Sequence, residues 1–169
     1  MDVAGGLFTA VVWLVLGVTI TVTGLRARHH ERSRRVAVVA VAVMWVVGGA
    51  LVNLLTLVEG GDYAGFADGS PSAFVTDTWE SLVVPHAAVF IGLLVVFEAV
   101  VGLLVLVPGR TRQVALGLLV AFDVLLVSFG WGFLLWTLPV TAGLLGLWRA
   151  ERSRAADLGA PVAAAPVTG

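Results

Sequence analysis

The sequence contains no cysteine, and charged residues make up only 12% of its 169 positions. Without cysteine, the chain cannot form disulfides, bind iron–sulfur clusters or zinc through thiolates, or use a thiol nucleophile. The charged fraction is about half of the usual ~25%. The net charge of −1 gives no reason to expect nucleic acid as a partner.

Apolar residues, by contrast, account for 59% of the sequence and give a mean hydropathy of +1.02. A soluble domain of this size keeps much of its surface in water and must cover that surface with polar side chains. This chain has too few polar residues to do so. We therefore predict an all-α integral membrane protein, a bundle of transmembrane helices whose main partner is the lipid bilayer.

Long apolar runs indicate the number of spans, because a helix needs ~20 mostly apolar residues to cross the hydrocarbon. Residues 7–25, 36–58 and 83–107 each form one such run. Residues 114–148 form a fourth run, which is too long for one helix unless it tilts severely. We predict that this run forms two short helices with a turn at residues 129–132 (Phe-Gly-Trp-Gly), each helix reaching roughly 25 Å at 1.5 Å per residue.

The positions of the basic residues favour five transmembrane helices over four. All ten are arginines, and they occur only after the first span, after the third and after the last. Positive residues in short loops stay in the cytoplasm, and only five spans place all three groups on that side. We therefore predict a multi-pass cell-membrane protein with its N-terminus outside and its C-terminus in the cytoplasm.

These spans predict the domain organisation. A short outer N-terminus (1–6) precedes an N-terminal transmembrane helix (7–25) and a basic cytoplasmic loop (26–35). A four-helix membrane core (36–148) is followed by a cytoplasmic tail (149–169) that is rich in alanine and expected to be disordered. The first helix is expected to be a permanent anchor and not a signal peptide, because no basic region precedes it.

The acidic loop at residues 59–82, expected on the outer side, has a helical pattern of its own. Ser70 followed by Pro71 is typical of the start of a helix. Apolar residues, including Trp79, then recur at helical spacing. We predict a short amphipathic helix on the outer membrane surface, after which Pro85 turns the chain into the next span.

Two acidic residues interrupt the predicted spans, Glu98 in the third and Asp123 in the fourth. Ionisable groups within the membrane are costly, and they are functional hypotheses by default. Both residues lie equally far from the centre of their hairpin, between Arg110 and Thr111, so regular helices would place the two carboxyls at one depth. Burial disfavours a charged carboxylate, and we expect at least one of the two to be protonated at neutral pH.

Two roles stay open for Glu98 and Asp123. In a structural role, they hydrogen-bond to neighbouring helices and hold the bundle together. The partners available for this role are Ser128, Thr137, Thr141, Asn53 and the tryptophan N–H groups. In a functional role, they form an intramembrane polar site with Asn53 and His86, which serves as a proton relay or as a head-group site for a quinone-like ligand.

The sequence points to no haem or metal. His86 is the only histidine outside the basic loop, so a haem with two membrane-embedded histidine ligands is not expected. His29, His30 and Glu31 resemble a metal site, but arginines surround them, and we expect a solvated segment there with no metal. We expect the arginines of this loop to contact anionic lipid head groups. They are Arg26, Arg28, Arg32, Arg34 and Arg35.

No GxGxxG, Walker, GxSxG, HExxH or CxxC motif is present, so we assign no catalytic residue and leave open whether the chain is an enzyme. Several short segments do have a recognisable pattern. They are Gly-Gly-Ala-Leu-Val-Asn at 48–53, Phe-Ala-Asp at 66–68, residues 79–85, the apolar run at 92–104 and Pro-Gly-Arg at 108–110.

In these segments, residues 48–148 resemble the DoxX-like family of integral membrane proteins. The most specific piece is Phe97-Glu98 followed by Gly102. The resemblance implies a four-helix core, to which residues 7–25 are an N-terminal addition. It also implies a link to quinone-coupled oxidoreductase complexes and to soluble redox enzymes, with Glu98 as the site residue carried over.

Three functions are compatible with the sequence. The first is a small membrane subunit of a quinone-linked or partner-dependent oxidoreductase complex, whose redox chemistry belongs to a bound quinone or to a soluble partner on the cytoplasmic face. The second is a non-catalytic membrane scaffold or assembly protein. The third is a proton-coupled transporter using Glu98 and Asp123, which would need a homo-oligomer because five spans are a small scaffold.

Overall fold

The computed structural model describes the backbone of residues 3–159 and the side chains of residues 10–157, and all regular structure in this part of the chain is helical. In chain order the elements are α1 (Val3–Arg26), α2 (Glu31–Val43), the π-helical η1 (Met44–Leu51), α3 (Val52–Val58), α4 (Ala73–Thr78), the π-helical η2 (Trp79–Val83), the 3-10 turn η3 (Val84–His86), α5 (Ala87–Leu104), α6 (Arg110–Leu126), the 3-10 turn η4 (Val127–Phe129) and α7 (Trp131–Gly159).

Four helical segments in the described part of the chain are long and apolar enough to cross a membrane. They are Glu31–Val58, Ala73–Leu104, Arg110–Phe129 and Trp131–Asp157. The N-terminal helix α1 contributes a shorter apolar stretch, Ala10–Arg26. The predicted all-α class and four long apolar helices at the predicted positions are thus confirmed, and these helices support a multi-pass membrane protein. The crossing of α1 stays a prediction.

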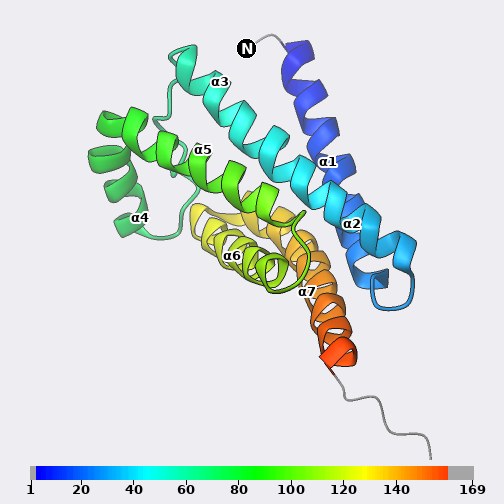
Figure 1. The fold of residues 1–169 in the computed structure, drawn as a ribbon. Helices are drawn as coiled ribbons and strands as arrows, with labels where there is room; N and C mark the ends of the chain where they lie inside the picture. The colour runs from blue at the N-terminus through cyan, green and yellow to red at the C-terminus, as the bar shows by residue number, and fades with distance from the viewer. Residues whose placement is uncertain (1–2, 160–169) are drawn as a thin grey trace, which may run out of the picture.

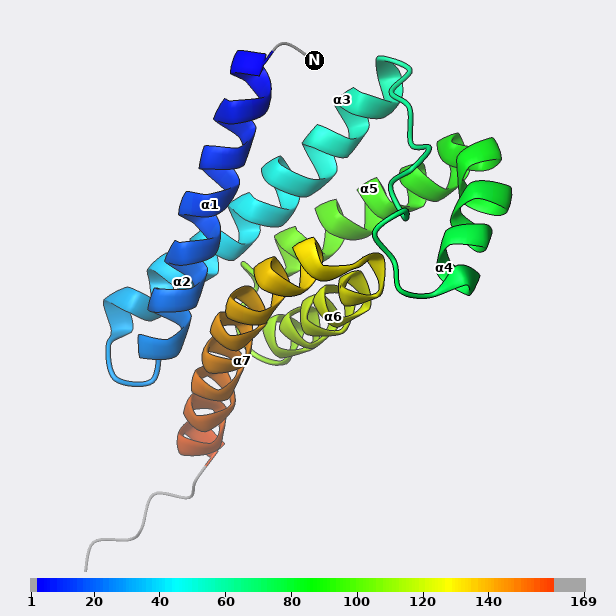
Figure 2. The same ribbon diagram turned by 180° about the vertical axis from the view of Figure 1, so that it is seen from behind.

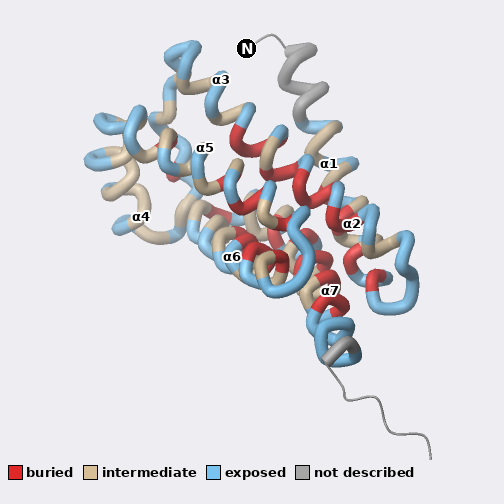
Figure 3. The backbone as a smooth tube through the Cα atoms, in the orientation of Figure 1, coloured by how far each residue is buried: buried red, intermediate tan, exposed pale blue. Residues whose placement is uncertain are grey.

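The outward faces of the helices carry large apolar side chains. Leu125 is 67% exposed and Leu135 is 75% exposed. Buried positions instead gather where the helices face one another in the middle of the molecule (Figure 3). Soluble proteins rarely expose apolar surface on this scale, whereas hydrocarbon chains solvate it well.

The long apolar run after residue 114 breaks into two helices at the predicted turn. α6 ends at Leu126, η4 follows, and Gly130 adopts a φ of 123° before α7 begins. An L side chain rarely adopts this conformation. A Cβ at Gly130 would also collide with the carbonyl group of Gly69. Glycine is therefore required at this position, which ends one helix and reverses the chain into the next.

Glycines bring α1 and α7 into close contact along their length, and the two helices run in the same direction (Figure 2). Gly24 meets the backbone of Gly143, and Gly146 meets the backbone of Gly24. Small residues allow helices to approach closely, which strengthens van der Waals packing in a membrane. α1 is therefore packed into the bundle, against α7.

The last helix is longer than predicted. We expected the fifth span to end at Trp148 and disorder to follow, but α7 continues to Gly159. The buried side chain of Glu151, which is paired with two arginines, holds this extension against the bundle. Residues 160–169 of the predicted tail lie outside the described residues.

Two further boundaries differ from the prediction. α1 begins at Val3 and not at residue 7, and the predicted amphipathic helix begins at Ala73, as α4, later than Ser70 and Pro71 suggested. The Ser70 hydroxyl donates a hydrogen bond to the Ser128 carbonyl, 2.7 Å away, and so ties the loop to η4. The turn predicted at Pro85 is present as η3, and α4 lies at an angle to α5 (Figure 1).

All three arginine-bearing segments meet at one end of the bundle, as five alternating helices require (Figure 1). We call this the basic end; it holds the α1–α2 turn (27–30), the α5–α6 turn (105–109) and the last turns of α7. The opposite end, which we call the loop end, holds residues 59–72 and α4. Which side of the membrane each end faces stays a prediction.

Candidate functional site

A cavity of about 260 Å³ lies inside the bundle, between α1, η1, α3, α5, α6 and α7. Its wall is mainly apolar and aromatic, and its polar side chains are Glu98, Asp123 and Asn53. The aromatic members of the wall are Trp13, Trp45, Trp136, Phe66, Phe122 and Phe133. A concave apolar site with a few convergent polar groups is the usual form of a small-molecule site.

Glu98 enters the cavity from α5 and is only 5% exposed. Its Oε2 atom accepts a hydrogen bond from Nδ2 of Asn53, 2.8 Å away on α3. Gly49 makes room for the carboxyl group, because a Cβ at that position would lie 2.5 Å from Oε1 of Glu98. Gly49 belongs to the π-helical η1, and π-helical turns are frequent at functional sites.

Asp123 enters the same cavity from α6 and is 2% exposed. Its Oδ2 atom accepts a hydrogen bond from Oγ1 of Thr141, 2.6 Å away on α7. Each carboxyl group is therefore held by a neutral polar side chain of another helix. These two contacts set the orientation of both acids.

One oxygen of each carboxyl group has no hydrogen-bond partner among the described residues. These atoms are Oε1 of Glu98 and Oδ1 of Asp123. Neither is fully enclosed, since the Tyr63 hydroxyl is the only completely buried side-chain polar atom without a partner in the described part of the chain. The two acids thus retain hydrogen-bonding capacity at the wall of the cavity they share.

Four aromatic side chains, which we call the aromatic cap, cluster at the loop end of the cavity, and two of them, Phe66 and Phe133, line the cavity. Phe66 stacks on Trp79 with 4.8 Å between the ring centroids, and its centroid lies 5.2 Å from that of Phe129 and 5.4 Å from that of Phe133. The Trp79 indole N–H donates a hydrogen bond to the Tyr63 carbonyl, 2.8 Å away. The loop thus folds back over the bundle and contributes Phe66 to the cavity wall.

Three of the four predicted polar-site residues line one cavity: Glu98, Asp123 and Asn53. His86 does not line it and lies in η3, at the start of α5. The sequence reading missed the contribution of α1, which provides Trp13. The sequence feature that could have indicated this contribution is the pair Gly17 and Gly24, seven residues apart on α1, which permits close contact with another helix.

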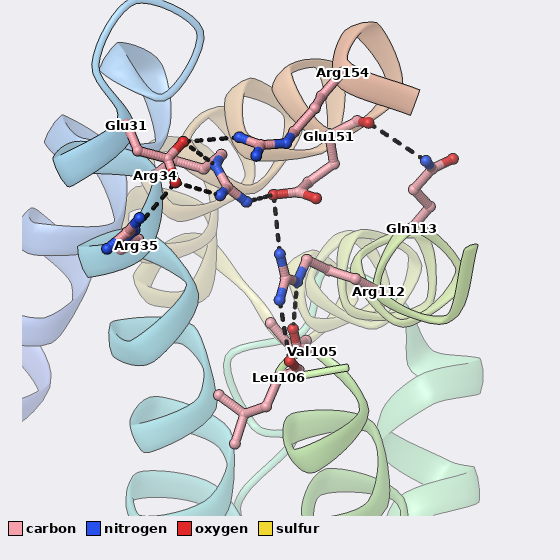
Figure 4. Close-up of polar contacts among 9 residues, drawn as sticks. All are labelled: Glu31, Arg34, Arg35, Val105, Leu106, Arg112, Gln113, Glu151 and Arg154. Atoms are coloured by element: carbon pink, nitrogen blue, oxygen red, sulfur yellow. Dashed lines mark hydrogen bonds and ion pairs between the residues drawn. The ribbon is translucent and has the colours of Figure 1, made fainter. Parts of the chain in front are cut away.

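The sequence reading also missed a clasp of ion pairs at the basic end (Figure 4). Oε1 of Glu151, on α7, accepts hydrogen bonds from Arg34 on α2, 2.6 Å away, and from Arg112 on α6, 3.1 Å away. Arg112 also donates to the carbonyl groups of Val105 and Leu106, at 2.7 and 3.0 Å. One buried carboxylate therefore connects α2, α6, α7 and the α5–α6 turn.

The arginines predicted to contact lipid head groups have unequal surroundings. Arg26, Arg28, Arg32 and Arg35 are exposed. Arg34 is half-buried and paired with both Glu31 and Glu151. Its charge is thus engaged within the protein, while the other four retain access to the surroundings of the bundle.

No group of three or more His, Asp or Glu side chains in the described part of the chain is placed to hold a metal ion. The chain matches no protein-family model, no curated protein and no solved structure. The DoxX-like resemblance thus depends on the short segments alone and stays a prediction.

Proposed function

We propose that this small multi-pass membrane protein binds a flat, largely apolar ligand with a polar head group, of the quinone class, in the cavity that Glu98 and Asp123 share. In this proposal the chain is the membrane subunit of a quinone-linked or partner-dependent oxidoreductase complex. The observation that supports it most directly is the presence of two acids, from neighbouring helices, in the otherwise apolar, aromatic wall of one cavity.

The shape and chemistry of the cavity suit such a ligand. Its volume of about 260 Å³ lies just below the range of roughly 300–1,000 Å³ for drug-sized ligands, so it accommodates one ring system and not a long tail. Aromatic walls favour stacking with a flat ring. The partner-free oxygens of Glu98 and Asp123 supply the hydrogen bonds that orient a polar head group.

The residues of this chain bind and orient the ligand, whereas the electrons come from a partner protein. The chain has no cysteine, so it holds no thiolate-ligated redox centre of its own. In this proposal, a soluble redox partner docks at the arginine-rich basic end. The redox chemistry then belongs to the bound ligand and that partner.

A non-catalytic scaffold is the second candidate, and the hydrogen bonds of the two acids favour it. Asn53 with Glu98 joins α3 to α5, and Thr141 with Asp123 joins α6 to α7. In a scaffold, the buried acids would serve only to join the helices through these hydrogen bonds, and the cavity would bind no specific ligand.

Tryptophan fluorescence separates the two candidates, because three tryptophans line the cavity. We expect a short-chain benzoquinone to quench the fluorescence of the purified full-length protein saturably. A quinone carbonyl accepts a hydrogen bond from a protonated carboxyl group, and glutamine would keep a donor at this position. Glu98→Leu removes the donor and should weaken the affinity about tenfold, the loss of one hydrogen bond worth roughly 1.4 kcal/mol. Glu59→Leu is the matched control, because Glu59 is exposed at the end of α3.

Analysis of what stays bound after extraction in mild detergent completes the test. A quinone that co-purifies with the natural protein and is depleted in Glu98→Leu would support the redox-subunit proposal. Quenching without saturation, or equal affinity in Glu98→Leu and Glu59→Leu, would contradict it. If Glu98→Leu then changes only the thermal stability, the scaffold is the better description.

A further inference from the structure

A second hollow lies on the outer surface of the bundle, between α1 and α2. This groove has a volume of about 420 Å³. It is lined by Leu16 of α1 and by the residues Arg35, Val36, Val39, Ala40 and Val43 of α2. Arg35 is its only charged side chain, and the rest of its wall is apolar.

The groove begins at the basic end and runs along α2 toward the middle of the bundle. Arg35 and Val43 are eight residues apart on α2, which corresponds to about 12 Å at 1.5 Å per residue. Half of the hydrocarbon core is about 15 Å thick. The groove is therefore long enough to hold much of an acyl chain, with its single charged group at the end nearest the basic end.

The charge around Arg35 is positive. Arg34, Arg35 and Arg154 all pair with Glu31, while Arg34 and Arg112 pair with Glu151 (Figure 4). Four guanidinium groups against two carboxylates leave two positive charges in this network. The Arg35 side chain is 76% exposed, so it can contact an anion while it stays near Glu31.

We propose that the α1–α2 groove binds one phospholipid with an anionic head group, with an acyl chain along Val36, Val39 and Val43 and the phosphate at Arg35. The charge of the network opposes the ammonium group of a zwitterionic lipid and attracts a head group with net negative charge. The proposal is independent of the ligand in the central cavity, because no residue lines both hollows.

Native mass spectrometry of the full-length protein in mild detergent tests this site. Phosphatidylglycerol and phosphatidylcholine with identical acyl chains are added in equal amounts. We expect preferential retention of phosphatidylglycerol, and we expect Arg35→Gln to reduce it about fivefold, the effect of one arginine near an anionic membrane surface. Arg32→Gln is the matched control, since Arg32 is exposed on α2 but does not line the groove.

A second pair of variants tests the groove without changing any charge. Val39→Trp fills the groove and should also reduce phosphatidylglycerol retention, whereas Val47→Trp, at an exposed position outside the groove, should not. Circular dichroism shows whether each variant keeps its helical content. Both valines and both arginines are exposed, so we expect all four variants to fold.

The proposal is overturned if the two lipids are retained equally, or if Arg35→Gln behaves like Arg32→Gln. A third arm distinguishes a lipid from a free anion. If inorganic phosphate alone raises the melting temperature as much as phosphatidylglycerol does, and Arg35→Gln removes both effects, the site binds free phosphate and the acyl groove is not part of it.

Discussion

The amide of Asn53 on α3 donates a hydrogen bond to the carboxyl group of Glu98 on α5, across a distance of 2.8 Å. This contact joins residues that are 45 positions apart in the chain. It satisfies one oxygen of a buried acid, while Gly49 provides the space that the same carboxyl group needs. The orientation of Glu98 toward the cavity therefore depends on residues of η1 and α3 and not on α5 alone.

Replacement of Asn53 by Leu should lower the free energy of unfolding by about 0.6–1.7 kcal/mol, the range measured for hydrogen bonds between membrane helices. The substitution removes the donor and leaves Glu98 without a partner. Chemical unfolding in detergent micelles measures the change. Thr141→Val should have a similar effect on Asp123, and the deviation of the double variant from the sum of the two effects measures the coupling of the two acids through the cavity that they share. If Asn53→Leu unfolds with the same free energy as the natural protein, the hydrogen bond to Glu98 does not stabilise the bundle.

Replacement of Glu151 by Gln should destabilise the protein by roughly 3–5 kcal/mol, because it leaves the buried side chain of Arg112 without a counter-charge. Glu31→Gln is the matched control. Glu31 also pairs with arginines but lies at the surface, so its loss should have a much smaller effect. Melting temperatures of the two variants test this prediction. If Glu31→Gln lowers the melting temperature as much as Glu151→Gln does, the buried ion pairs of Glu151 do not hold the helices together.

Replacement of Gly24 by Ala should cost about 1–3 kcal/mol, since the added methyl group meets the backbone of Gly143 and separates α1 from α7. Gly92→Ala is the control, because a Cβ at this position in α5 meets nothing within 4 Å. There alanine should be neutral or stabilising by up to ~1 kcal/mol, as in any helix interior. Thermal unfolding of both variants in the same detergent tests the pair, and equal melting temperatures would argue against close α1–α7 packing.

Tyr63, the only tyrosine in the chain, should ionise at a higher pH than an ordinary tyrosine does. Burial raises the pKa of its hydroxyl group above 10.0, because the charged form is poorly solvated there. The stability that the neutral Tyr63 hydroxyl contributes to the loop is fully present below pH 10. It is lost as the pH rises through the raised pKa of the folded state. Tyrosinate absorbance measures the midpoint, with Tyr63→Phe as the blank. A midpoint at or below 10 would show that the hydroxyl is not enclosed.

The sequence predicted the features that depend on local composition and on helical periodicity. Apolar run length located four spans, and glycine at 130 marked the break between α6 and α7. The restriction of arginine to three segments predicted that those segments meet at one end. Equal spacing of Glu98 and Asp123 from their hairpin turn predicted a common depth, but depth alone does not determine which way each helix faces.

The helix boundaries at both ends of α7 show the limit of local reasoning. Gly130 ends the preceding helix through its own backbone conformation, so its effect is visible in the sequence. The extension from Trp148 to Gly159 depends on Glu151, whose partners Arg34 and Arg112 are 117 and 39 residues away. In the sequence alone, Glu151 is one more charged residue in a polar tail.

A bundle of apolar helices with two acids inside it and its arginines at one end thus follows from local sequence features, because run length, hydropathy and charge act through local physics. That Glu98, Asp123 and Asn53 line one cavity, and that Trp13 joins them from α1, is visible only in the folded chain. The rotation of each helix about its axis is set by the fit of side chains from distant segments, and an apolar helix with little polar pattern does not encode that rotation on its own.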